Sequence, residues 1–135
     1  MFILSPTGDQ ISGQRELTSK RAAREAIYMP ERGDIVWLIL DPRAGHEQSG
    51  RQPVIVLSHR KLAEHTNLVI VSPITSAVRG LPYEVVLAGT ITQGAVLPIH
   101  VRSVDFRHRR AAFIEKAPDA ILAKTIQGVQ NIIGT

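Results

Sequence analysis

Short runs of branched aliphatic residues, separated by turn-forming segments, constrain the fold of this chain more than any other feature. Between the runs, segments such as DPRAGHEQSGRQ and AGTITQ carry the glycine, proline and aspartate of turns. Several short strands at close spacing predict a small antiparallel barrel or sandwich. A single helical turn is predicted for RKLAEH, residues 60–65. The predicted strands are residues 34–40, 53–58, 67–74, 83–88, 94–97 and 99–105.

The C-terminal residues 117–135 predict one helix. Pro118 stands near its first position and Asp119 lies in its first turn, where each residue type is favourable. Apolar residues at helical spacing then form a single stripe, which we expect to pack on the barrel. The stripe consists of Ile121, Leu122, Ile126, Val129, Ile132 and Ile133.

The length of the chain, 135 residues, suffices for one compact domain and is too short for two ordinary ones. Its first part differs from the rest, because residues 5–14 are polar and turn-like and residues 15–29 hold helix-forming residues with loosely helical apolar spacing. We therefore expect an N-terminal extension over residues 1–29, partly helical or disordered, and one mainly β domain over residues 30–135.

The amino-acid composition limits the kinds of functional site that this chain can form. The absence of cysteine excludes disulfides, zinc-thiolate sites and thiol nucleophiles, and the five histidines show no recognised metal-ligand spacing. No apolar stretch approaches the roughly 20 residues that span a bilayer, and the opening MFIL lacks the flank and length of a signal peptide. We expect a cytoplasmic protein without metal or cofactor. Its formal charge of +4 suits a partner that carries phosphates.

Ionisable side chains gather on the loop before the second predicted strand, which carries His46, Glu47 and Arg51. Such a trio can cleave a phosphodiester without a metal, because one group deprotonates a hydroxyl, another protonates the leaving oxygen, and the guanidinium holds the phosphate charge. Surface loops also carry these residue types without any chemical role. Likewise, the arginine-rich segment 102–110 suits either a phosphate backbone or the charged rim of an edge strand.

Three longer segments, taken together, resemble the MazF/PemK family of toxins from bacterial toxin–antitoxin systems. They are ERGDIVWLILDPRAGHEQSGRQPVIVLS, VSPITSAVRGLPYEV and GAVLPIHVRSVDFRHRRA. The resemblance runs from about Glu31 to the C-terminus, whereas family members usually begin near Met29. It implies an SH3-like barrel with a C-terminal helix, a homodimer and a MazE-like antitoxin partner. It also implies metal-independent cleavage of single-stranded RNA, including mRNA, by attack of a ribose 2′-hydroxyl.

The resemblance also implies where the RNA site lies. It places His46 and Glu47 in the RNA groove, on the loop between the first two strands, and Thr75 beside the scissile phosphate. With Arg51, these are the expected catalytic residues. The expected RNA-binding residues are Gln52, Ser76, Arg79, His100 and Arg102.

Three departures from the family pattern bear on activity. Gln52 stands where the family has a phosphate-stabilising arginine, and Arg51 precedes it. Because neighbouring strand residues point to opposite faces, Arg51 is expected to replace that arginine only if an irregular loop turns it inward. Ile99 and His100 stand where aspartate and glutamine are usual, and Ile39 where a polar residue is frequent. These changes remove polarity from the predicted groove, although His100 can supply a general base.

Three functions therefore remain open at the level of the sequence. The first is a sequence-specific endoribonuclease toxin that an antitoxin neutralises. The second, favoured by the residues at Gln52 and Ile99, is a catalytically impaired relative that binds antitoxin or RNA without efficient cleavage. The third is a toxin that poisons gyrase, since related barrels inhibit that enzyme. The loop motifs favour the first.

Overall fold

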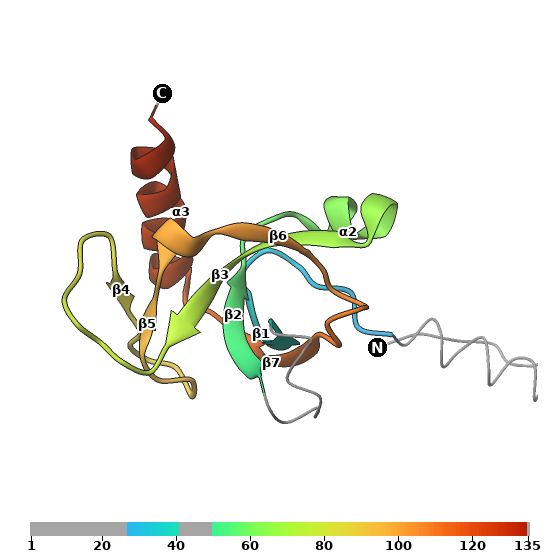
Figure 1. Cartoon of the computed structure of the whole chain (residues 1–135), viewed down its shortest axis with the longest axis horizontal. Coiled ribbons are helices and arrows are strands. Elements are labelled where there is room, and N and C mark those ends of the chain that lie inside the picture. Colours follow the sequence, from blue (N-terminus) through green and yellow to red (C-terminus); the bar gives the residue numbers. More distant parts are fainter. Residues whose placement is uncertain (1–26, 41–49, 135) are drawn as a thin grey trace, which may run out of the picture.

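The computed structural model describes residues 27–40 and 50–134. They form a curled antiparallel sheet, a half-barrel, with one long helix standing against it (Figure 1). This confirms the predicted mainly β fold with a C-terminal helix. The strands are β1 (Asp34–Ile39), β2 (Arg51–Val56), β3 (Leu68–Thr75), β4 (Val85–Val86), β5 (Ala95–Val96), β6 (Arg102–Asp105) and β7 (Ala112–Lys116). The helices are α2 (Arg60–Thr66), the 3-10 turn η2 (Pro98–His100) and α3 (Asp119–Ile133).

The sheet is organised around β3, the longest strand. The strand order is β4-β5-β3-β2-β1-β7, and β6 pairs with the first half of β3 while β5 pairs with its end. Every pairing among the described strands is antiparallel. In the β1–β2 pair, Leu38 lies opposite Gln52 and Ile39 lies opposite Arg51, so the residues of the predicted site that begin β2 sit beside the end of β1.

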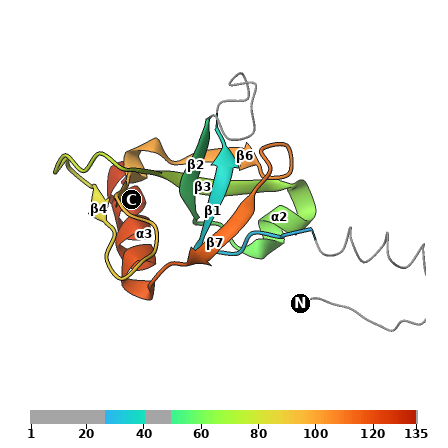
Figure 2. The same cartoon turned by 90° about the horizontal axis from the view of Figure 1, so that it is seen from below.

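The central strands bury both of their faces. Because successive strand residues point to opposite faces, Val36 and Val54 enter one core with Ala63 of α2, and Ile35 and Ile55 enter a second core with Ile121 of α3. Figure 2 shows α2 and α3 on opposite sides of these strands. The near-continuous aliphatic runs of β1 and β2 reflect this two-sided burial.

Several predicted strand boundaries were wrong, and one strand was not predicted. β2 ends at Val56 rather than at residue 58, and β4 spans only Val85–Val86 of the predicted 83–88. β2 begins at Arg51, two residues earlier than expected; at Pro53 it pairs only with β1, and such an edge position tolerates the missing N–H of proline. The strand expected over 99–105 begins at Arg102, because Pro98 starts the turn η2. The unpredicted strand is β7, which follows the arginine-rich turn.

The apolar stripe of α3 packs as predicted along most of its length. Ile121 is buried, and Leu122, Ile126 and Val129 pack against the second core. The expectation was wrong for the last two members, since Ile132 is 38% exposed and Ile133 is 75% exposed. Figure 1 shows the reason, because the end of α3 extends beyond the sheet.

The described chain begins with a segment tied to β7. The Tyr28 hydroxyl donates to Asp34, whose carboxylate also accepts the Glu31 N–H at 3.0 Å and Lys116 Nζ at 2.7 Å. These partners compensate a carboxylate that is only 4% exposed. Burial of the ring, together with Asp34, raises the pKa of the Tyr28 hydroxyl, which therefore stays protonated as the donor.

Tyr28 and Met29, which we assigned to the N-terminal extension, pack against the first core. Residues 1–26 lie outside the described residues. The helical extension and the boundary at residue 29 therefore stay predictions.

Replacing Ser72 with alanine is expected to raise the free energy of unfolding by about 1 kcal/mol. The Ser72 hydroxyl is fully buried opposite Ile55, and no partner for it occurs within the described residues. An unpaired buried hydroxyl carries a desolvation cost of about 1–3 kcal/mol, part of which the small void left by the substitution offsets. Chemical denaturation measures the difference. A less stable S72A protein would show that the hydroxyl has a partner.

Candidate functional site

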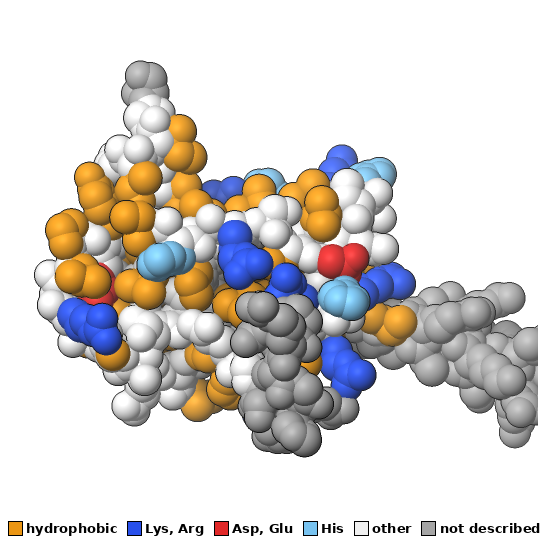
Figure 3. Space-filling model, in the orientation of Figure 1, with side chains coloured by type: hydrophobic (Ala, Val, Ile, Leu, Met, Phe, Trp, Pro, Cys, Tyr) orange, Lys and Arg blue, Asp and Glu red, His pale blue; other side chains and the backbone are white. Residues whose placement is uncertain are grey.

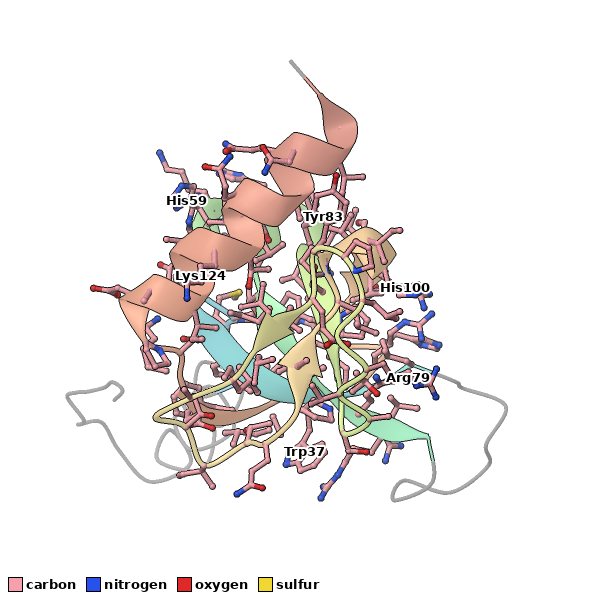
Figure 4. All side chains as sticks on the ribbon, turned by 90° about the vertical axis from the view of Figure 1, so that its left-hand side faces the viewer. Trp37, His59, Arg79, Tyr83, His100 and Lys124 are labelled. Atoms are coloured by element: carbon pink, nitrogen blue, oxygen red, sulfur yellow. The ribbon has the colours of Figure 1, made fainter. Side chains whose placement is uncertain are left out.

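An open cavity of about 640 Å³ lies where the ends of β1, β2 and β3 meet the loop before β5. We call it the groove. Trp37, at its wall, lies at the opposite end of the molecule from the exposed tip of α3 (Figure 4). The lining residues are Trp37, Gly50, Arg51, Gln52, Pro53, Ile74, Thr75, Ser76, Ile91, Thr92, Gln93 and Ile114.

Arg51 lies over the indole ring of Trp37. Its guanidinium carbon is 4.3 Å from the ring centroid, which is a cation–π contact. The strand register explains this contact, because Trp37 lies opposite Pro53 and Arg51, two residues from Pro53, shares its face. Our expectation that only an irregular loop would bring Arg51 inward was wrong. Arg51 belongs to β2, and the groove at the beginning of this strand is lined by both Arg51 and Gln52, although neighbouring strand residues point to opposite faces.

Gln52 also lines the groove, and it is half-buried. Its side-chain nitrogen donates to the carbonyl of Ile74 at 3.2 Å, a hydrogen bond that joins the beginning of β2 to the end of β3. Gln52 therefore helps to hold two walls of the groove together. It brings no positive charge, so Arg51 is the only charged residue among those that line the groove in the described part of the chain.

Thr75 is the last residue of β3, and its side chain reaches the groove. The Thr75 hydroxyl oxygen accepts the Ala77 N–H at 3.1 Å, which fixes the position of that oxygen at the strand end. Since the oxygen accepts in this bond, the hydroxyl hydrogen is available to donate to an anion in the groove. Ser76, next in the chain, is exposed in the same wall.

The opposite wall is a loop, residues 91–93, that is held by a carboxylate. Glu115 of β7 accepts the N–H of Ile91 at 2.9 Å and that of Thr92 at 2.7 Å. Burial tends to raise the pKa of the Glu115 carboxyl, but the hydrogen bonds from Ile91 and Thr92 outweigh it and lower that pKa. The carboxylate is thus ionised at neutral pH and fixes the loop.

Acidification is expected to loosen this loop before the domain unfolds. The pKa of the Glu115 carboxyl is lowered in the folded state. The stability that the ionised carboxylate gives to the folded loop is therefore complete at neutral pH, and it is lost as the pH falls through that lowered pKa. Amide hydrogen exchange by NMR, corrected for the intrinsic pH dependence, should show protection of Ile91 and Thr92 declining in this range. In Glu115→Gln, the protection of Ile91 and Thr92 should no longer depend on pH in this range. Protection that stays constant down to global unfolding would contradict it.

The structure brings four of the predicted site residues together, namely Arg51, Gln52, Thr75 and Ser76. Arg79, His100 and Arg102 are exposed and lie outside the groove lining. Figure 4 shows Arg79 and His100 along one side of the molecule, apart from Trp37. Their predicted RNA contacts stay predictions. His46 and Glu47 fall outside the described residues.

We had expected all the departures from the family pattern to lie in the groove, but only one of these residues is among those that line it. Ile99 is 60% exposed on η2, and neither it, His100 nor Ile39 lines the groove. Only Gln52 does. The expectation that these changes remove polarity from the RNA groove therefore stays a prediction for Ile99, His100 and Ile39.

The arginine-rich segment contains one arginine that anchors a neighbouring strand and others that are exposed. The Arg109 guanidinium donates to the carbonyls of Ile39 at 3.0 Å and Leu40 at 2.7 Å, which anchors the end of β1. Arg102 and Arg107 are exposed, and basic and histidine side chains spread over β6 and the turn after it (Figure 3). Arg109 thus has a structural role, while the exposed groups remain candidates for phosphate contacts.

Several groove residues were missed by the sequence analysis: Trp37, the loop 91–93, Ile114 and the supporting Glu115. The sequence offered a reason to consider Trp37 as a site residue, because it is the sole tryptophan and stands on a strand between two buried positions. The loop TITQG gave none beyond its turn composition.

Within residues 27–40 and 50–134, histidine, aspartate and glutamate side chains nowhere gather in threes that could hold a metal ion. Among the helices of the same residues, none has the length and apolarity to cross a membrane.

Comparison with known proteins decides the family. The model of a family described as PemK-like, MazF-like toxin of type II toxin-antitoxin system matches residues 31–133. The chain belongs to the PemK/MazF toxin family. The match includes every described residue that lines the groove.

Curated PemK/MazF relatives agree with this assignment. The endoribonuclease toxin MazF of Escherichia coli K12 is 38% identical over 84 residues, which cover 62% of this chain and 76% of that protein. The endoribonuclease PemK of Escherichia coli is 32% identical over 130 residues, which cover 92% of this chain and 96% of that protein. The part that the PemK alignment omits is smaller than residues 1–29, so this alignment extends into the N-terminal segment.

Solved PemK/MazF structures share the fold. MazF from Deinococcus radiodurans is 41% identical, with 80% of this chain and 99% of that chain covered and a TM-score of 0.72. A MazE–MazF complex from the same organism is 36% identical, with 80% and 98% covered and a TM-score of 0.71.

Proposed function

We propose that this PemK/MazF family member is a sequence-specific, metal-independent endoribonuclease that cleaves single-stranded RNA in the groove. The relatives MazF and PemK are named endoribonucleases, which supports the activity. The observation that carries the proposal is the meeting of a guanidinium, Arg51, and a hydroxyl, Thr75, in one open groove. Such a groove suits a phosphodiester. We propose that the substrate includes mRNA, and we therefore propose that the protein acts in the cytoplasm.

The proposed reaction is attack of a ribose 2′-hydroxyl on the adjacent phosphate. A base removes the 2′-hydroxyl proton, the 2′-oxygen bonds to phosphorus, the bond from phosphorus to the 5′-oxygen breaks, and an acid protonates that oxygen. The products are a 2′,3′-cyclic phosphate and a 5′-hydroxyl. We assign the proton transfers to His46 and Glu47.

Arg51 and Thr75 act on the phosphate in this scheme. The Arg51 guanidinium stabilises the negative charge that builds on the phosphate oxygens, and the Trp37 ring keeps it in the groove before RNA binds. The Thr75 hydroxyl, fixed by its bond from Ala77, donates to one of those oxygens. Ser76 and Gln52 line the path of the strand.

The proposal includes two partners. Solved relatives in complex with MazE support a MazE-like antitoxin that neutralises this chain. A homodimer is supported by a mainly apolar hollow beside α3. It is lined by Leu57, Ile70, Val101, Ile126 and Val129, together with Arg32, Ser58 and Gln130. Light scattering should then give about twice the 14.8 kDa mass of one chain.

The test is incubation of the purified full chain with a long, sequence-diverse RNA in EDTA, with the ends mapped by primer extension. We expect cuts at a few defined sites, and we expect Thr75→Ala to weaken them strongly while its circular dichroism stays that of the parent. Cuts by Gln52→Arg alone would identify an impaired relative that lacks a charge. Intact RNA with every variant would overturn the proposal, and DNA damage on expression would then favour the gyrase alternative.

A further inference from the structure

We propose that Gln93 is a specificity-determining residue whose side-chain amide reads the edge of one RNA base beside the scissile phosphate, and that Glu115 positions the loop that carries it. The inference rests on the proposed ribonuclease function and deepens it. It arises from three observations on the loop 90–94.

First, the loop is anchored on both sides. Glu115 holds the N–H groups of Ile91 and Thr92. At the other end, Gly94 approaches β3 so closely that a Cβ placed on it would lie 2.0 Å from the carbonyl oxygen of Thr75. The loop therefore keeps a fixed position relative to the residue assigned to the scissile phosphate.

Second, this fixed loop presents side chains without internal partners to the groove. Ile91 is 78% exposed, and Gln93 is exposed beside it. Within the described residues the Gln93 amide makes no hydrogen bond. By contrast, the amide of Gln52 donates to Ile74, and that of Gln127 donates to Asn131. The Gln93 amide is thus free for a ligand.

Third, the two walls of the groove differ in charge. Arg51 gives one wall a cation suited to phosphate, whereas Ile91, Thr92 and Gln93 are uncharged. An unpaired base offers donors and acceptors on its edge and an apolar face. An amide donates and accepts together, so it matches such an edge, and Ile91 matches the face. The uncharged wall therefore suits a base, with the backbone held by Arg51 opposite.

The test sequences the 5′ ends of RNA fragments cut by the parent, Gln93→Ala and Gln93→Glu. We expect Gln93→Ala to relax the preference at one position of the cleavage site by about 10-fold or more, which is typical of a lost two-point base contact. Gln93→Glu, which only accepts at neutral pH, should shift the preference at that position toward a base that donates. Gln127→Ala on α3 is the matched control and should keep the parent consensus.

The outcomes separate this inference from the function on which it rests. An inactive parent overturns the proposed function and this inference with it. An active parent whose consensus survives in both Gln93 variants overturns this inference alone, as does a uniform loss of cleavage at all sites.

Glu115→Gln tests the positioning role. The amide has one acceptor where the carboxylate had two, so the loop should loosen. We expect relaxed preference at the same base position as in Gln93→Ala, together with faster hydrogen exchange at Ile91 and Thr92. A general loss of rate with the parent consensus retained would show that Glu115 only stabilises the domain.

Discussion

Replacing Arg51 with alanine is expected to slow RNA cleavage by about 10²–10³-fold, which is the usual effect of removing one electrostatic contact to a transition state. Among the described residues that line the groove, Arg51 is the only cation. The loss falls on the chemical step, so kcat should fall more than KM rises. Initial rates on a short RNA that contains the mapped site measure both.

The controls separate charge from fold. Arg51 is exposed, and its contact with Trp37 contributes at most about 1 kcal/mol, so R51A should unfold cooperatively near the parent stability. Arg51→Lys keeps the positive charge but lacks the planar guanidinium, so its cleavage rate should lie between those of R51A and the parent. Lys124→Ala removes an exposed cation of α3 that lies outside the groove lining, and its cleavage rate should stay close to that of the parent. A rate for R51A within about three-fold of the parent would contradict the role.

Replacing Gly94 with alanine is expected to lower the free energy of unfolding by about 3 kcal/mol and to abolish cleavage. Gly94 has a φ of +125°, and the new Cβ would lie 2.0 Å from the Thr75 carbonyl oxygen and 2.9 Å from its carbon. Neither backbone can avoid the other without moving the loop or the end of β3. Urea denaturation measures the stability, and the mapped RNA measures the activity.

Gly89→Ala is the matched control for this substitution. Gly89 also has a positive φ, +73°, but a Cβ there meets nothing within 4 Å. Gly89→Ala should lower the free energy of unfolding by only about 1 kcal/mol, because only the backbone conformation is unfavourable for alanine there. The difference between the two variants isolates the contact with Thr75. Equal stability of the two would contradict that close approach.

The fold could be predicted from the sequence where pattern and packing agree. The aliphatic runs of β1 and β3 and the stripe on α3 follow directly from burial, because each element covers a core. The exposure of Ile132 and Ile133 could not be predicted, since it depends on where the sheet ends beneath the helix. Likewise, the pairing of Ile39 with Arg51, which sets the face of Arg51, is a matter of register rather than of local sequence.

The groove could be predicted only in part, for a similar reason. Arg51, Gln52 and Thr75 stand in segments whose residue types suggest phosphate chemistry. The opposite wall depends on hydrogen bonds between Glu115 and residues 91–92, which are more than twenty positions away in the chain. Such a contact leaves no periodicity or motif. The tertiary structure alone brings it to the site.

The most direct test of the central claim compares two versions of one RNA oligonucleotide in EDTA. One contains the mapped site with ribose throughout, and the other has a single 2′-deoxyribose on the 5′ side of the cut. We predict that the protein cleaves only the first, leaving a 2′,3′-cyclic phosphate and a 5′-hydroxyl, and that Thr75→Ala cleaves it far more slowly. Cleavage of the deoxy version at the same bond, or unchanged cleavage by Thr75→Ala, would contradict a reaction of the 2′-hydroxyl in this groove.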